Sequence, residues 1–325
     1  MTAGGGDTAT IVVGEGVFND VSVEEAHAGD SATISLARID DPADVATATR
    51  EADALIVTTH ALTRAHVEQL QSTVRVVARA GVGVDAIDLV ALRERGIALV
   101  NTPGYATEEV ATHAVALLLA LQRRLVSADA VARDNWRDWR RVGAIAPLQE
   151  MTVGLVGCGR IGRAFTARIV PLVAHVLVYD PLASESPPRT ELVGGLAELL
   201  ERSDAISLHA PLTEETAGII DGEAIARMRH GALLVNVARG GLVDETAAAD
   251  ALHAGQLGGV AVDVLAEEPP PVDAPLLGAP GTLVTPHIAW YSSGSERRVR
   301  EQAVDGVLRV LAGRSPEPAA FVVRP

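Results

Sequence analysis

The chain has 325 residues, of which 48% are hydrophobic and 3% aromatic, with a mean hydropathy of +0.23. This length favours about two domains with cores of Ala, Val, Leu and Ile, and the net charge of −15 argues against nucleic-acid and anionic-membrane surfaces, which need a basic face. All 27 basic residues are arginine, which excludes Schiff-base and P-loop lysines.

The first hundred residues alternate between strand-like and helix-like segments. Short apolar runs predict strands at residues 10–13, 33–36, 54–57, 74–78 and 97–100. Segments of helical length lie between them, such as 63–71 and 88–95. The alternation predicts a doubly wound α/β domain with a parallel sheet.

A turn-rich break and an arm follow this domain. Residues 101–105, NTPGY, predict a hinge, and a long apolar helix is expected over 107–124. Residues 134–149 read as an irregular arm that carries Trp136 and Trp139 among charged residues. These side chains either cover an oligomer contact, which would indicate a homodimer, or fold back onto their own domain.

Residues 151–180 have the order of a βαβ unit. An apolar run at 152–156 predicts a buried strand, 160–170 has helical spacing, and a second strand at 175–179 ends in Asp180. A glycine turn between strand and helix also occurs in α/β proteins that bind nothing. The complete strand, helix, strand and terminal acid favour a dinucleotide site instead.

The glycines of this unit form a GxGxxG motif. Gly157 allows a tight turn, Gly159 lets a pyrophosphate approach the backbone, and Gly162 lets helix and strand pack closely. The helix N-terminus then favours a diphosphate. Asp180 lies where its carboxylate can accept hydrogen bonds from a ribose diol and repel a 2′-phosphate. The motif therefore predicts NAD rather than NADP.

The only cysteine, Cys158, lies inside this turn, so no intrachain disulfide can form. It is either a thiol exposed near the cofactor or a small filler. The first six residues lack a basic n-region, and the most apolar helical stretch, 110–121, is too short to span a bilayer. We expect a cytoplasmic protein without a membrane or metal site.

Four more apolar runs complete the second domain, at residues 205–208, 232–237, 259–262 and 282–285. With the two strands of the βαβ unit they make six, the number in a complete dinucleotide fold. Asp244 is a candidate N-cap of one connecting helix and Gly255 its stop. A final helix over 292–311 is expected to return to the first domain and make it discontinuous.

Three polar residues follow strands of the second domain, at the edge where parallel sheets bind ligands. Arg239 follows ALLVNVA, Glu268 lies just past GGVAVDV, and His287 follows TLVTP. Arginine can bind a carboxylate bidentately, histidine can give or take a hydroxyl proton, and glutamate can fix the histidine tautomer. Each alone could be a structural residue; together they indicate an active site.

The chain resembles the D-isomer-specific 2-hydroxyacid dehydrogenase family over nearly its whole length. The matching stretches are RAGVGVDAID (79–88), VGCGRIG (156–162), SLHAPLT (207–213), LVNVARGGLVDE (234–245), GVAVDVLAEEP (259–269) and TPHIAW (285–290). The resemblance implies a Rossmann-type NAD-binding domain at 101–289. It implies a flavodoxin-like substrate domain made of 1–100 and 290–325.

The resemblance also implies residue roles. Arg239, Glu268 and His287 occupy the family's catalytic positions, so hydride would pass between the nicotinamide and C2 of a small 2-keto or 2-hydroxy acid while His287 carries the proton. Val82 and Gly83 would offer backbone N–H groups to the substrate carboxylate, which Arg239 also anchors. The residues implied to bind the cofactor are Gly157, Gly159, Arg160, Ile161, Gly162, Asp180, Pro211, Ala238 and Asp263, the last holding the nicotinamide carboxamide.

Departures from the family pattern bear on the substrate. Ala86 replaces a usual Asn, and Trp290 and Tyr291 replace small residues after the catalytic His. We expect Trp290 to line the substrate pocket; the alternative is a domain-interface anchor. The arginine that phosphoglycerate enzymes commonly carry near Thr58 is missing, so phosphoglycerate is a weak substrate hypothesis.

Other functions stay open within the family. Glu268 argues against a formate dehydrogenase, which typically has Gln there. The stretches HIAWYS and THALTR look more like the C-terminal-binding-protein branch, whose animal members are NAD-sensing corepressors. An NAD(H)-dependent oligomerising interaction protein and a phosphite dehydrogenase are therefore the alternatives to a 2-hydroxyacid dehydrogenase.

Overall fold

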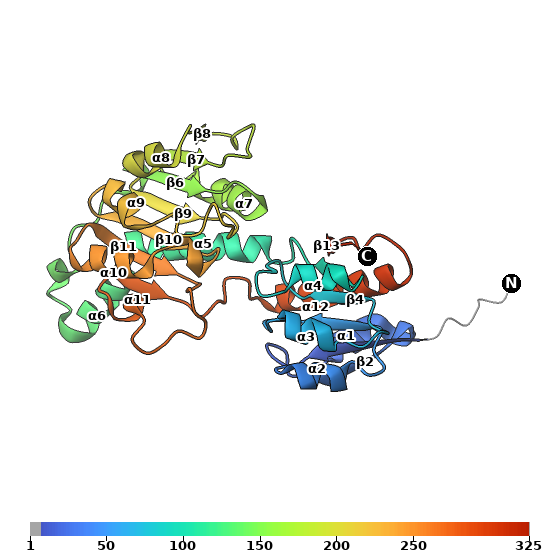
Figure 1. The fold of residues 1–325 in the computed structure, drawn as a ribbon. Helices are drawn as coiled ribbons and strands as arrows, with labels where there is room; N and C mark the ends of the chain where they lie inside the picture. The colour runs from blue at the N-terminus through green and yellow to red at the C-terminus, as the bar shows by residue number, and fades with distance from the viewer. Residues whose placement is uncertain (1–7, 325) are drawn as a thin grey trace. The chain divides into compact units, whose positions relative to one another are not determined.

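The computed structural model describes residues 8–324, which divide into two compact units (Figure 1). The first unit holds the described residues up to Ala106 and from Ser292 onward, and the second spans Thr107–Tyr291. Residues 101–106, predicted in the second domain, belong to the first unit because Asn101 pairs with Arg79 in its sheet. Trp290, predicted in the substrate domain, belongs to the second unit.

The first unit is built on a six-stranded sheet in the order β13-β5-β4-β3-β1-β2. Its strands are β1 (Ala9–Gly14), β2 (Ala32–Ala37), β3 (Ala54–Val57), β4 (Val76–Arg79), β5 (Ala98–Asn101) and β13 (Ala320–Val323). The five predicted strands are present and parallel. Strand β13, which was not predicted, pairs antiparallel with β5 at the edge.

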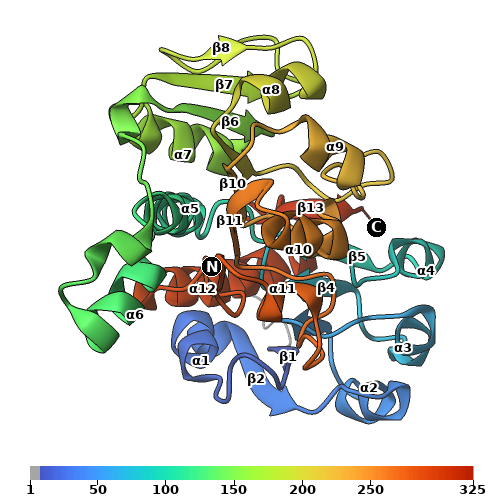
Figure 2. The ribbon, with the colours of Figure 1, turned by 90° about the vertical axis from the view of Figure 1, so that its left-hand side faces the viewer.

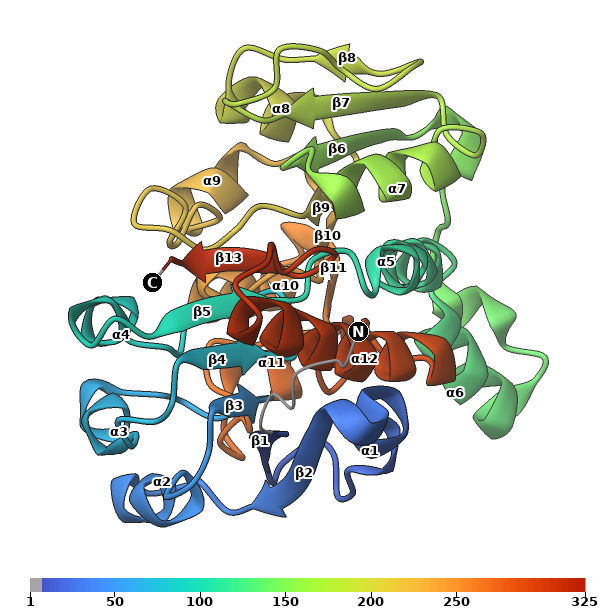
Figure 3. The same cartoon turned by 90° about the vertical axis from the view of Figure 1, so that its right-hand side faces the viewer.

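Helices cover both faces of this sheet, with α2, α3 and α4 on one face and α1 and α12 on the other (Figure 3). They are α1 (Ser22–Ala28), α2 (Pro42–Ala48), α3 (Arg64–Gln69), α4 (Leu89–Glu94) and α12 (Ser293–Leu311), with a 3₁₀ turn η1 (Gly29–Ser31). Helix α12 begins with a capping box at Ser292 and buries Val299, Ala303 and Val307. Its predicted return to the first domain is observed.

The second unit contains a seven-stranded parallel sheet in the order β12-β11-β10-β9-β6-β7-β8. Its strands are β6 (Thr152–Val156), β7 (His175–Tyr179), β8 (Glu191–Leu192), β9 (Ala205–Leu208), β10 (Ala232–Asn236), β11 (Leu257–Val262) and β12 (Thr282–Val284). All six predicted strands are confirmed. The two-residue β8 was missed because so short and exposed a segment has no periodicity to read.

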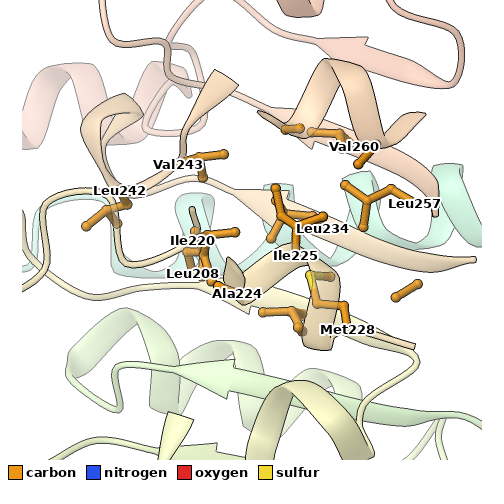
Figure 4. Packing of buried hydrophobic residues seen from close by; sticks show 14 of the residues in the cluster. Leu208, Ile220, Ala224, Ile225, Met228, Leu234, Leu242, Val243, Leu257 and Val260 are labelled. Atoms are coloured by element: carbon orange, nitrogen blue, oxygen red, sulfur yellow. The ribbon is translucent and has the colours of Figure 1, made fainter. Parts of the chain in front are cut away.

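Helices again cover both faces, with α5 and α7 on one and α8, α9, α10 and α11 on the other (Figure 2). They are α5 (Thr107–Gln122), α6 (Leu125–Asn135), α7 (Arg160–Ile169), α8 (Leu196–Arg202), α9 (Gly222–Arg227), α10 (Glu245–His253) and α11 (Pro275–Gly278), with 3₁₀ turns η2 (Trp139–Val142), η3 (Leu148–Glu150) and η4 (Gly240–Leu242). Asp244 caps α10 as predicted. Figure 4 shows Leu234 and Val260 of the sheet packed with Ile225 and Met228 in the core.

The predicted arm, residues 134–149, begins at the end of α6, and the short 3₁₀ turns η2 and η3 lie within it or at its end. Trp136 is 80% exposed and Trp139 is 61% exposed, and the guanidinium of Arg140 lies 4.4 Å from the Trp139 ring centroid. The hypothesis that these tryptophans fold back onto their own domain is therefore wrong. Over residues 8–324, every helix is too short or too polar to traverse a lipid bilayer.

Candidate active site

The glycine turn connects β6 to α7 as the sequence predicts. Gly157 has φ 89°, and a Cβ there would lie 2.6 Å from the Ala210 nitrogen. A Cβ on Gly162 would lie 2.3 Å from the Gly157 carbonyl oxygen. Both positions therefore require glycine for packing within the protein.

Gly159 differs from the other two glycines because a Cβ there would meet no heavy atom within 4 Å. It precedes α7, whose first residues are Arg160 and Ile161 and whose N-cap has no side-chain hydrogen bond. Open space therefore faces backbone N–H groups at a helix start. A diphosphate fits this arrangement.

Asp180 follows β7 and reaches back to the turn. Its Oδ2 accepts a hydrogen bond from Cys158 N–H at 2.7 Å, and its Oδ1 accepts one from Leu182 N–H at 2.9 Å. Strand β6 lies between β7 and β9, where the chain reverses its direction across the sheet, so the turn opens at the topological switch point. Cys158 is buried, and burial raises the pKa of its thiol, which confirms the filler hypothesis.

Two further predicted cofactor residues lie at the same sheet edge. Pro211 comes shortly after β9, and its carbonyl accepts a hydrogen bond from the Thr216 hydroxyl at 2.6 Å. Ala238 comes after β10 and donates its N–H to Asn236 Oδ1 at 3.0 Å. The buried Asn236 also donates from Nδ2 to the Arg239 carbonyl at 2.8 Å. One asparagine thus holds the turn that carries Arg239.

Glu268 and His287 form a direct pair. His287 Nδ1 lies 2.6 Å from Glu268 Oε2, and Leu265 N–H donates to Glu268 Oε1 at 3.0 Å. Partial burial raises the pKa of Glu268, but the hydrogen bond and charge of His287, the Leu265 N–H and the charge of Arg239 outweigh it and lower the pKa below its usual value. The ionised carboxylate accepts the proton on Nδ1 of the imidazole, which leaves Nε2 for a ligand.

The Arg239 and Glu268 loops are packed backbone to backbone. A Cβ on Gly240 would lie 1.9 Å from the Leu265 carbonyl carbon, so only glycine permits this approach. Ala266 N–H also donates to Glu245 Oε1 at 2.6 Å. These contacts explain how Arg239 comes close enough to Glu268 to influence its pKa.

The predicted residue Asp263 has a role that the sequence did not suggest. Its side chain is 1% exposed, and its carboxylate accepts hydrogen bonds from Thr285 Oγ1, Ile288 N–H and Ala289 N–H. His287, between these donors, has φ 52°, a left-handed conformation that few non-glycine residues adopt. Asp263 thus supports the loop that carries His287, while its contact with the nicotinamide carboxamide stays a prediction.

The other predicted substrate residues belong to different units of the fold. Val82 and Gly83 follow β4 in the first unit, where the Asn101 side chain donates to the Val82 carbonyl at 2.8 Å. Within residues 8–324 the N–H groups of Val82 and Gly83 donate to no acceptor. Trp290, in the second unit, packs edge-to-face on Tyr291 with ring centroids 5.6 Å apart.

Residues 115–289 match the family model for the NAD-binding domain of D-isomer specific 2-hydroxyacid dehydrogenases. That range is more than half of the chain and includes the glycine turn, Arg239, Glu268 and His287. The chain belongs to this family. The family resemblance read from the sequence and the prediction of NAD as the cofactor are thereby confirmed. The open glycine turn at the start of α7 fits this cofactor.

The chain is similar to curated relatives and to a solved structure. It is 39% identical over 268 residues to D-3-phosphoglycerate dehydrogenase of Mycobacterium tuberculosis, covering 81% of this chain and 50% of the relative. It is 34% identical over 265 residues to hydroxypyruvate reductase of Thermotoga maritima, covering 80% and 85%. The NAD complex of formate dehydrogenase from Staphylococcus aureus superposes with a TM-score of 0.85 at 28% identity, covering 97% of this chain and all of that one. The chain thus spans about half the length of the mycobacterial relative.

Proposed function

We propose that the chain is an NAD-dependent oxidoreductase that interconverts a small 2-keto acid and its D-2-hydroxy acid. The observation that carries the proposal is the 2.6 Å contact between His287 Nδ1 and Glu268 Oε2, with Arg239 close enough to act on Glu268. This set lies in the family's NAD-binding domain. A carboxylate-supported histidine beside an arginine suits proton transfer to an oxygen next to a carboxylate.

The glycine turn and Asp180 are proposed to bind the cofactor. The N–H groups around Gly159 would hold the diphosphate, and Asp180 would accept hydrogen bonds from the ribose diol. Gly157 and Gly162 keep the turn in shape. When bound, the nicotinamide supplies or accepts the hydride exchanged with C2 of the substrate.

The protein's own groups handle the proton and the carboxylate. In the reducing direction His287 Nε2 donates a proton to the oxygen on C2, and in the oxidising direction it takes that proton back. The Glu268 carboxylate stabilises the imidazolium through Nδ1. Arg239 binds the substrate carboxylate and polarises the carbonyl, and the N–H groups of Val82 and Gly83 are proposed as further donors to the carboxylate.

The proposed substrate is a 2-keto acid without a phosphate group. Relatives are named for phosphoglycerate, hydroxypyruvate and glyoxylate. Phosphoglycerate enzymes commonly carry an arginine near the position of Thr58. In this chain Thr58 itself is 2% exposed and has no charge to offer a phosphate group. Trp290 and Tyr291 add an aromatic surface close to His287 in sequence, and we propose that Trp290 contacts the substrate side chain.

A homodimer through the arm is part of the proposal. Leu125 and Val126 at the start of α6 and Trp136 and Trp139 in the predicted arm are each more than half exposed. Exposed apolar surface of this kind marks protein contacts. The assignment to the C-terminal-binding-protein branch and the cytoplasmic location stay predictions.

The test is NADH consumption by the purified protein against glyoxylate, hydroxypyruvate and longer 2-keto acids, with NADPH as the cofactor control. We expect turnover that His287→Ala abolishes while NADH binding persists. His253→Ala, at an exposed histidine of α10, is the matched control and is expected to keep full activity.

Three results would redirect the proposal. An active His287→Ala variant would reject the proton-transfer role. Silence across the panel with intact NADH binding, together with an NADH-dependent dimer, would favour the interaction protein. NADH formation from phosphite would favour the phosphite dehydrogenase.

A further inference from the structure

A hydrogen-bonded series of side chains supports the loop that carries His287. Its members are His113, Thr285 and Asp263, none of which is one of the three proposed catalytic residues. Thr285 Oγ1 lies 2.5 Å from Asp263 Oδ1, and His113 Nε2 lies 3.0 Å from Thr285 Oγ1. A hydroxyl has one proton, and the Asp263 carboxylate can only accept, so the Thr285 proton points to Asp263. Thr285 therefore accepts from His113, whose proton is on Nε2.

The chain continues from Asp263 into the backbone around His287. The Asp263 carbonyl accepts from His287 N–H at 2.8 Å, and its carboxylate accepts from Ile288 N–H at 2.9 Å and Ala289 N–H at 2.8 Å. Three consecutive N–H groups are thus bound to one buried residue. They begin at His287, the position with φ 52°.

The His287 conformation needs such support from its surroundings. Non-glycine residues persist in the left-handed region only where neighbouring groups determine the backbone. The His287 side chain is 48% exposed, so packing alone does not hold the ring. The contact with Glu268 orients the ring, whereas the backbone that carries it is held by Asp263.

We propose that His113 and Thr285 are positioning residues for the reaction of His287. They fix the Asp263 carboxylate, which holds the backbone of residues 287–289 and keeps the imidazole aligned with Glu268. The inference rests on the proposed function, because it assigns His287 the proton transfer. It gives α5, which contains His113, a part in the site although 172 residues separate His113 from Thr285.

The kinetic test uses paired variants at each position. Thr285→Val keeps the shape but removes the hydroxyl, and we expect kcat to fall by about ten- to a hundredfold through loss of alignment. The KM for the keto acid should stay within about twofold of wild type, since no contact with the substrate is assigned to Thr285. Thr285→Ser, which restores the hydroxyl, should recover kcat.

His113 provides a second pair in case the threonine variants fold poorly. His113→Leu removes the donor at a half-buried position and should lower kcat, whereas His113→Gln keeps an N–H donor and should retain most of it. A fall in kcat with Thr285→Val that Thr285→Ser does not rescue would overturn the proposal. Unchanged kcat in both Thr285→Val and His113→Leu would overturn it as well.

A measurement without substrate separates this inference from the proposed function. The NMR shifts of the His287 ring nitrogens, identified by their absence in His287→Ala, report the Nδ1 contact with Glu268. We expect Thr285→Val to move these shifts and Thr285→Ser to restore them. If wild type reduces no keto acid but the shifts respond this way, the proposed reaction fails and the positioning role stands. If the shifts do not respond, the positioning role fails.

Discussion

His209, just past β9, offers a sharp test of burial at the cofactor edge of the sheet. Its Nε2 lies 2.9 Å from Ser207 Oγ, and its ring packs 5.0 Å from the Phe165 ring. Nδ1 is shielded from solvent and has no hydrogen-bond partner among residues 8–324. Burial lowers the pKa of this imidazole from 6.5 to about 3.

The sign of the pH effect follows from this lowered pKa. Below pH 6.5 His209 is mostly protonated in the unfolded chain, whereas in the folded protein it stays neutral until the pH falls to about 3. The stability contributed by the neutral ring is therefore lost as the pH falls through this window. Acidification from about pH 7 to about pH 5.5 should cost about 1 kcal/mol of unfolding free energy through His209 alone.

Urea unfolding followed by tryptophan fluorescence measures this cost in the second unit, which contains His209. The three tryptophans, Trp136, Trp139 and Trp290, all lie in the second unit with His209. Between the two pH values His209→Gln should lose about 1 kcal/mol less unfolding free energy than wild type, because it removes only the His209 titration.

Ser207→Ala is the matched control for this measurement, since it keeps the buried ring and loses one hydrogen bond. It should lower stability by the same amount at both pH values. If wild type and His209→Gln show the same pH dependence, the claim that His209 stays neutral when folded is refuted.

Three further predictions concern stability and cofactor binding. Glu24→Gln should cost about 3 kcal/mol in the first unit, measured by far-UV circular dichroism in urea, because it removes the carboxylate that pairs with the buried Arg300 guanidinium; a loss below about 1 kcal/mol would contradict this. Gly162→Ala should destabilise the second unit by about 1–3 kcal/mol, whereas Gly159→Ala, with open space at its Cβ, should keep stability and lose NADH affinity. Asp180→Ala should weaken NADH binding by about tenfold or more and narrow the preference over NADPH; an unchanged preference in titrations would refute its role.

The sequence was most informative where function depends on local backbone geometry. The spacing of Gly157, Gly159 and Gly162 between two apolar runs predicted the turn. Gly157 and Gly162 lie against backbone atoms that leave no room for a Cβ, whereas Gly159 faces open space. Asp244 as a helix cap was also readable, because capping is likewise local. Arg239, Glu268 and His287 could be grouped because parallel strands end at one edge.

Tertiary structure decided the features that join distant segments. Strand β13 pairs with β5 only because the chain returns to the first unit through α12. The sequence shows His113 merely as a polar break in an apolar helix, and its bond to Thr285 depends on how α5 packs against the sheet. The burial of His209 is likewise set by neighbours such as Phe165.

The division between the two has one physical cause. Turn, cap and strand signals act over a few residues, so composition and spacing determine them. The support for the His287 backbone comes from a carboxylate buried on a neighbouring strand end and from a helix far away in the chain. Hydrogen bonds of that kind exist only after the layers have packed, and the sequence by itself does not specify them.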